Sequence, residues 1–192
     1  MGFLKKLFGA SAPDGPEQLT SASVGKLLAE LSCGSNPGIL DMLIEELPSK
    51  NRADAFLALA SLSLFAWIRA SQSESLQLDL ASQKEIYHSF ASFLVVQYLQ
   101  QFGGSEDPNA IVYEITSNAR GLLDVWNNSQ GKEPLPHWYV AKAVWFMLQE
   151  DPDRPDPVQI MALTELLSSE TLGFLEFVRD IQGYIIKQGG AT

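Results

Sequence analysis

The stretch from Ala55 to Ile68, Ala-Phe-Leu-Ala-Leu-Ala-Ser-Leu-Ser-Leu-Phe-Ala-Trp-Ile, decides the fold class of this chain. It carries no formal charge and is apolar on nearly every face of a helix, which is typical of a helix buried at the centre of a fold. Ser49 or Asn51 can cap this helix, which we predict to run to about Ala70. The uncharged stretch is shorter than the roughly 20 residues that span a bilayer, so we expect a core helix.

Helical patterns continue on both sides of this stretch, and each is bounded by residues that start or stop a helix. Gly34, Pro48 and Gly103 are stop signals. The Asp-Pro pairs at 107–108 and 156–157 are start signals, because Asp caps a helix and Pro suits its first turn. The remaining helices are predicted over residues 17–33, 37–47, 82–102 with Ser82 as the cap, 107–128, 136–148, 158–167, and 169–185 with Ser169 as the cap.

The connections between these helices are short, which favours antiparallel neighbours in a compact array. We therefore predict an all-α fold, a single compact domain of about seven main helices. Alternating strand patterns are nearly absent, and residues 75–80 are the one weak candidate. The helical domain is predicted over residues 17–188, after a short amphipathic segment at 1–9 and a linker at 10–16, and before a frayed tail at 189–192.

Composition excludes several classes of protein. The 192 residues include 13 Lys plus Arg and 23 Asp plus Glu, which gives a formal net charge of −10. Nucleic acids are bound through Lys and Arg that neutralise phosphates, so we exclude them as partners. The content of 46% hydrophobic residues excludes disorder over most of the chain. The single cysteine, Cys33, excludes an intramolecular disulfide and a multi-cysteine zinc site, and we expect it to be a buried free thiol.

The first nine residues have the pattern of a short amphipathic helix. Its apolar face holds Phe3, Leu4, Leu7 and Phe8. Its basic face holds Lys5 and Lys6. The apolar region is too short for a secretory signal, so we expect a cytoplasmic protein. Exposed apolar surface usually has a partner, and we expect this segment to be a contact site for a membrane surface or a protein. Packing on its own domain or on a second subunit is the alternative.

Glu85 and His88 form a Glu-x-x-His motif on a predicted helix, where both side chains share one face. Such a pair can ligate a metal, but di-iron helical bundles use two of these motifs with two further Glu residues. This chain has one motif, and nothing fixes Glu114 as a further ligand. We therefore favour a surface Glu beside a half-buried His, and expect no metal.

Aromatic residues concentrate between positions 126 and 146. Trp126, Trp138 and Trp145 could line a groove for a peptide or an apolar ligand. Large aromatic side chains more often fill the centre of a helical domain, which is the interpretation we favour.

Motifs of nucleotide binding and hydrolysis are absent from the sequence: Gly-x-Gly-x-x-Gly, the Walker Gly-Lys-Ser/Thr, Gly-x-Ser-x-Gly and His-Glu-x-x-His. We therefore favour a protein that is not an enzyme, and expect no cofactor. The predicted function is that of a non-catalytic cytoplasmic interaction or regulatory protein that binds another protein through a helical groove or an acidic face. The alternative is a helical-bundle enzyme or carrier that holds a metal or an apolar ligand near Glu85 and His88. The partner and the oligomeric state stay open.

Overall fold

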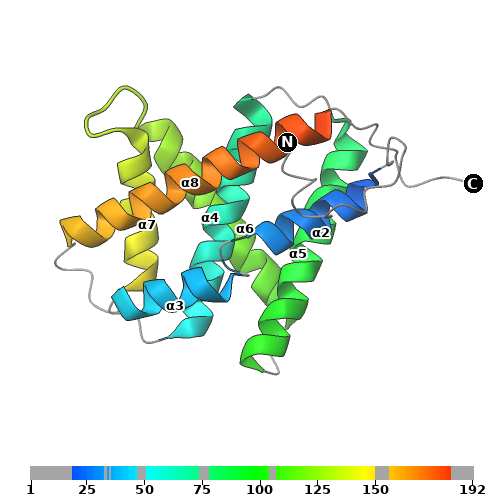
Figure 1. Ribbon diagram of the computed structural model, residues 1–192, viewed down its shortest axis with the longest axis horizontal. Helices are drawn as coiled ribbons and strands as arrows, with labels where there is room; N and C mark the ends of the chain where they lie inside the picture. Colours follow the sequence, from blue (N-terminus) through cyan, green and yellow to red (C-terminus); the bar gives the residue numbers. More distant parts are fainter. Residues whose placement is uncertain are drawn as a thin grey trace, which may run out of the picture.

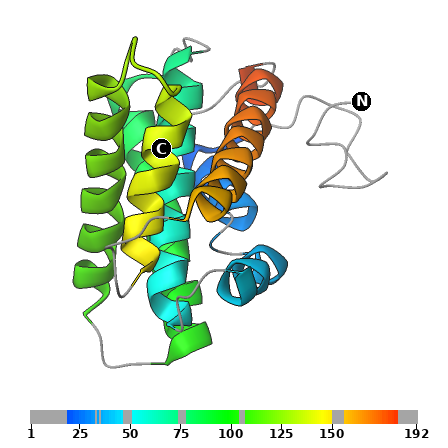
Figure 2. The same cartoon turned by 90° about the vertical axis from the view of Figure 1, so that its left-hand side faces the viewer.

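Helix α4, Arg52–Ser73, lies at the centre of the molecule and contacts five other helices. The structure is a computed structural model that describes residues 19–32, 34, 36–46, 51–73, 78–103, 107–149 and 156–182. The other helices are α2 (Ser21–Leu31), α3 (Pro37–Glu46), α5 (Leu80–Phe102), α6 (Pro108–Asn128), α7 (Pro136–Leu148) and α8 (Pro157–Gln182) (Figure 1). Figure 2 shows α4 running between α6 on one side and α8 on the other.

The prediction of an all-α fold is confirmed. The described residues form seven helices and no strand, and these helices pack against one another in a compact domain. Of the weak strand candidate, residues 75–77 lie outside the described residues, and Leu78 and Asp79 lead directly into α5.

Helix α4 is the one helix within the described ranges that is long and apolar enough to cross a membrane. Most of it is buried by other helices of this chain, which is the usual setting of a core helix in a soluble protein. Leu59 and Ala60 are fully buried, and Leu62 is 1% exposed. The uncharged stretch is therefore the core helix that its composition predicts.

Most of the predicted start and stop signals act as expected. Asp107 accepts a hydrogen bond from the Asn109 N–H at 3.0 Å, and Asp156 accepts one from the Val158 N–H at 2.8 Å. Asn51 accepts from the Ala53 N–H at the start of α4. Gly103 ends α5 with a φ of 65°, a conformation that glycine adopts without steric cost.

The prediction that Ser82 caps α5 is wrong, because Asp79 takes that role three residues earlier. The Asp79 carboxylate accepts from the Ser82 N–H at 2.8 Å and from the Ser82 hydroxyl at 3.1 Å. Ser82 lies inside the first turn, and its buried hydroxyl strengthens the cap made by Asp79.

The predicted helix break before Ser169 is also wrong, because α8 continues through this serine. The hydroxyls of Ser168 and Thr171 donate to the carbonyls of Thr164 and Leu167, four residues earlier, at 2.9 and 2.8 Å. A Ser or Thr that bonds in this way is accommodated inside a helix, so it starts no new one.

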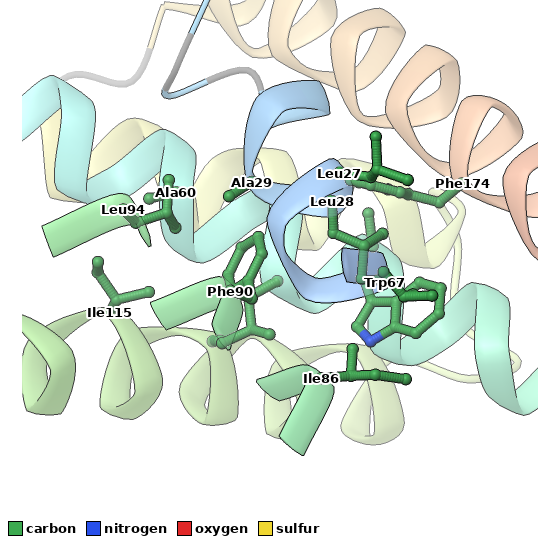
Figure 3. Close-up of a cluster of buried hydrophobic side chains, with 14 of the residues drawn as sticks. Leu27, Leu28, Ala29, Ala60, Trp67, Ile86, Phe90, Leu94, Ile115 and Phe174 are labelled. Atoms are coloured by element: carbon green, nitrogen blue, oxygen red, sulfur yellow. The ribbon is translucent and has the colours of Figure 1, made fainter. Parts of the chain in front are cut away.

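Helices α2 and α5 pack in close contact because Gly25 has no side chain. A Cβ atom added at Gly25 would lie 2.3 Å from the Ile86 carbonyl oxygen and 2.7 Å from the Ser89 Cβ. The Ser89 hydroxyl donates to the Ala22 carbonyl at 2.8 Å across the same contact. Figure 3 shows the hydrophobic cluster beneath this helix pair, which takes side chains from α2, α4, α5, α6 and α8: Leu27, Leu28, Ala29, Ala60, Trp67, Ile86, Phe90, Leu94, Ile115 and Phe174.

Candidate functional site

A surface groove of about 640 Å³ runs along the contact between α2 and α5. We call it the α2–α5 groove. Its walls are formed by Ala22, Ser23 and Lys26 of α2, and by Glu85, His88, Ser89, Ser92, Phe93 and Val96 of α5. The two walls lie close together because Gly25, at the contact of the two helices, has no side chain.

The α2–α5 groove has an apolar floor with charged groups beside it. Phe93 is half-buried and packs against the core, whereas the side chain of Val96 is 50% exposed. The Lys26 ammonium group lies 5.7 Å from the centre of the Phe93 ring, and 3.7 Å from the Glu30 carboxylate. An apolar strip bounded by single charges is an arrangement that can bind an amphipathic segment of another molecule.

Glu85 and His88 both line this groove, so the structure places them on one face as their spacing predicts. Their burial is the reverse of the expectation, because Glu85 is half-buried and His88 is exposed. In the part of the chain that the structure describes, no group of three or more His, Cys, Asp and Glu side chains comes together, so Glu114 does not join this pair. The geometry gives the two residues a place in the wall of the groove.

The three tryptophans occupy different settings, and none of them lines the α2–α5 groove. Trp145 is 2% exposed and lies in a hydrophobic cluster between α4, α7 and α8, where its indole N–H donates to Gln159 at 2.9 Å. Trp138 is half-buried, with the Lys142 ammonium group 5.3 Å from its ring centre. Trp126 is half-buried and packs against Phe65 of the core.

Trp126 also contacts two basic side chains from different helices. The Arg69 guanidinium lies 4.8 Å from the centre of the indole ring, and the His137 ring meets it edge to face at 4.9 Å. Burial lowers the pKa of His137 below the ordinary value of 6.5, and the nearby positive charge of Arg69 lowers it further. His137 is therefore uncharged at neutral pH in the folded protein.

The lowered pKa of His137 predicts that the folded state loses stability in mild acid. Between the folded-state pKa and the ordinary value of 6.5, the unfolded chain binds a proton that the folded chain does not. The free energy of unfolding should therefore fall as the pH is lowered through 6.5 toward the folded-state pKa. Urea denaturation at a series of pH values measures this slope. The substitution His137→Phe should flatten the slope of stability against pH, and the control His88→Gln should leave this slope unchanged. Equal slopes in both variants would contradict the assignment of the pH dependence to His137.

Two sequence predictions concern residues outside the described part of the chain. They are the buried free thiol expected at Cys33 and the contact segment with Phe3, Leu4, Lys5, Lys6, Leu7 and Phe8. Sequence reasoning missed Phe93, Val96 and Lys26 as groove residues. The available signal was the run of small residues Ala22, Gly25 and Ala29 at helical spacing, which permits close approach of another helix.

Comparisons with models of protein families, with curated proteins and with solved structures find no match to this chain. The class that the fold and the site define is that of an all-α domain with an amphipathic surface groove between two closely packed helices.

Proposed function

We propose that this protein is a non-catalytic, cytoplasmic interaction protein that binds a helical segment of a partner protein in the α2–α5 groove. The observation that carries the proposal is the exposure of Val96 in a groove whose floor is Phe93. An amphipathic helix binds such a groove by inserting apolar side chains spaced three or four residues apart.

Charge supports a partner segment that carries basic residues beside its apolar ones. Glu85 is half-buried in the groove wall, where a cation from the partner would be better shielded from water than at a fully exposed site. The formal net charge of −10 also favours encounter with a basic partner and disfavours an acidic one. Lys26 is engaged with Glu30 on its own helix, which reduces its repulsion of an incoming cation.

Site-specific photo-crosslinking in the native cell tests this proposal. A photoreactive residue at Val96 should capture a discrete partner, whereas the same residue at Tyr113, which is 74% exposed on α6 outside the groove, should not. With the purified partner, Val96→Glu should weaken binding by about tenfold or more, as expected for an apolar contact worth over about 1.4 kcal/mol. Tyr113→Glu should change the affinity by less than about twofold. Equal capture at both positions would contradict a specific site in the groove.

The amphipathic segment at residues 1–9 is proposed as a second contact element, for a membrane surface or for protein. Its two lysines would add about 2 kcal/mol at an anionic bilayer, while the acidic domain would be repelled from it. Wild-type protein should therefore sediment weakly with anionic vesicles at low salt, and Leu4→Asp/Phe8→Asp should abolish this. Absence of wild-type sedimentation would remove the membrane as its partner and leave a protein contact.

A further inference from the structure

A second hollow lies on the other side of α5, between its first turns and the second half of α4. We call it the α4–α5 cavity. Its volume is about 400 Å³, and it is partly enclosed. The residues that line it are Leu64, Trp67, Ile68, Ser71 and Gln72, and, from the start of α5 and the residues before it, Leu78, Gln83, Ile86 and Tyr87.

The lining of the α4–α5 cavity combines apolar side chains with uncharged polar ones. Leu64, Trp67 and Ile86 belong to the buried core, and Ile68 and Leu78 pack against them. Among the lining side chains that the structure describes, none carries a carboxylate, ammonium or guanidinium group. Burial of an ion without a counter-charge is costly, so this lining selects an uncharged ligand.

Two hydrogen-bond donors of the cavity have no acceptor in the described part of the protein. Trp67 is only 8% exposed, yet its indole N–H donates to none of the described residues. Figure 3 shows the indole nitrogen on the edge of the ring that faces Ile86, which is another lining residue. The hydroxyl of Tyr87 is likewise without a hydrogen-bond partner among the described residues. The indole nitrogen is not sealed off from solvent, so its N–H reaches the open space of the cavity, where a ligand can supply the acceptor.

Tyr87 is a donor rather than an anion in this setting. Partial burial raises the pKa of its phenol, and the opposing effect of the Arg120 charge is smaller. The hydroxyl therefore keeps its proton across the physiological pH range.

Hydrogen bonds within the protein already occupy other polar groups of the lining. The Ser71 hydroxyl donates to the Ile68 carbonyl at 2.9 Å, and the Gln83 amide donates to the Leu78 carbonyl at 2.8 Å. The side-chain oxygen of Gln72 accepts from the Arg69 guanidinium at 3.1 Å, which leaves the side-chain NH₂ group of Gln72 as another donor. The indole N–H of Trp67, the hydroxyl of Tyr87 and the side-chain amide of Gln72 remain as free donors, and an acceptor on a ligand can bond to them.

We propose that the α4–α5 cavity binds a small, uncharged amphiphile with an aliphatic body and one carbonyl oxygen. The aliphatic body contacts Leu64, Ile68 and Ile86, and the oxygen accepts from the indole of Trp67 or the hydroxyl of Tyr87. A volume of about 400 Å³ lies in the range of small-molecule sites. This binding activity goes beyond the proposed protein contact, because it uses the opposite side of α5.

Titration of the full chain with 2-octanone tests the proposal, with octanoate and octylammonium as probes of equal chain length. The readouts are calorimetry and the proton–nitrogen NMR signal of the Trp67 indole, assigned by its loss in Trp67→Phe. The expected result is saturable binding of 2-octanone with a downfield shift of the indole proton, weaker binding of octanoate, and no binding of octylammonium, which is a donor only. Absence of 2-octanone binding, or equal binding of octylammonium, would overturn the proposal.

Substitutions that remove single hydrogen-bond donors test whether 2-octanone binds in the α4–α5 cavity. Trp67→Phe and Tyr87→Phe keep the rings and remove one donor each, so at least one of them should weaken 2-octanone binding by about three- to tenfold. The matched controls Trp138→Phe and Tyr113→Phe lie outside the cavity and should leave the affinity unchanged. If Trp67→Phe does not fold, the Tyr87→Phe affinity decides. Unchanged affinity in both cavity variants, together with an unshifted indole signal, would overturn the assignment.

Discussion

Gly25→Ala should lower the free energy of unfolding by about 3 kcal/mol, toward the upper end of the range for overpacking in a core. The added Cβ atom would lie 2.3 Å from the Ile86 carbonyl oxygen and 2.9 Å from the Phe90 nitrogen. Both are backbone atoms of α5, so no side-chain rotation relieves the clash and the helices must separate. Separation would also weaken the hydrogen bond from Ser89 to the Ala22 carbonyl. Urea denaturation followed by circular dichroism measures the loss.

Two other helical glycines provide matched controls for this substitution. A Cβ atom at Gly121 of α6 or Gly173 of α8 would meet no atom within 4 Å. Alanine is favoured over glycine inside a helix by about 0.5–1 kcal/mol, so Gly121→Ala and Gly173→Ala should stabilise the protein by that amount. If Gly25→Ala behaves like these two variants, then α2 does not pack on α5 as described, and the α2–α5 groove would not exist in this form.

Local signals in the sequence were enough to predict the helices, apart from the break before Ser169, which α8 does not have. The uncharged stretch around Leu59 predicts a buried centre because a helix that is apolar all round is stable in water only inside a fold. The Asp-Pro pairs at 107–108 and 156–157 are specific because Pro lacks the N–H that an inner turn needs, while Asp accepts from the orphan N–H groups. Serine is a less specific signal of a helix start than an Asp-Pro pair. Ser82 and Ser169 can cap a helix or sit inside one, and the choice depends on which acceptor lies nearest in the folded chain.

The candidate sites depend on contacts between helices, whereas sequence patterns describe each helix separately. Glu85 and His88 were predicted to share a face, and they do, but the function of that face depends on α2, which lies more than fifty residues earlier in the sequence. The missed residues Phe93 and Val96 look like ordinary core residues of an apolar helix. Their place in a groove depends on the close approach of α2, which the missing side chain of Gly25 permits. The α4–α5 cavity was missed for the same reason, because the empty space between two helices has no local sequence signal.

The second large effect is expected for Leu59→Ala in the centre of α4. Leu59 is fully buried and belongs to a cluster with side chains of α6, α7 and α8: Leu122, Val140, Val144 and Leu163. Truncation of a buried leucine removes apolar contact and leaves a cavity, which costs about 2–5 kcal/mol. We expect a loss of about 3 kcal/mol in the free energy of unfolding, measured by urea denaturation with Trp fluorescence.

Leu172→Ala is the matched control, because Leu172 is also inside a helix but is 62% exposed. A surface substitution of this kind should change the stability by less than about 0.5 kcal/mol. The comparison also separates the two settings that the composition of α4 permits. If α4 lay in a bilayer, lipid tails would fill the space left by a truncated leucine, so Leu59→Ala and Leu172→Ala would cause similar losses of stability. In the helical core, neighbouring side chains hold their positions, so the cavity at Leu59 persists and the loss is larger. A loss below about 1 kcal/mol for Leu59→Ala would therefore contradict the central position of α4, which contacts five other helices.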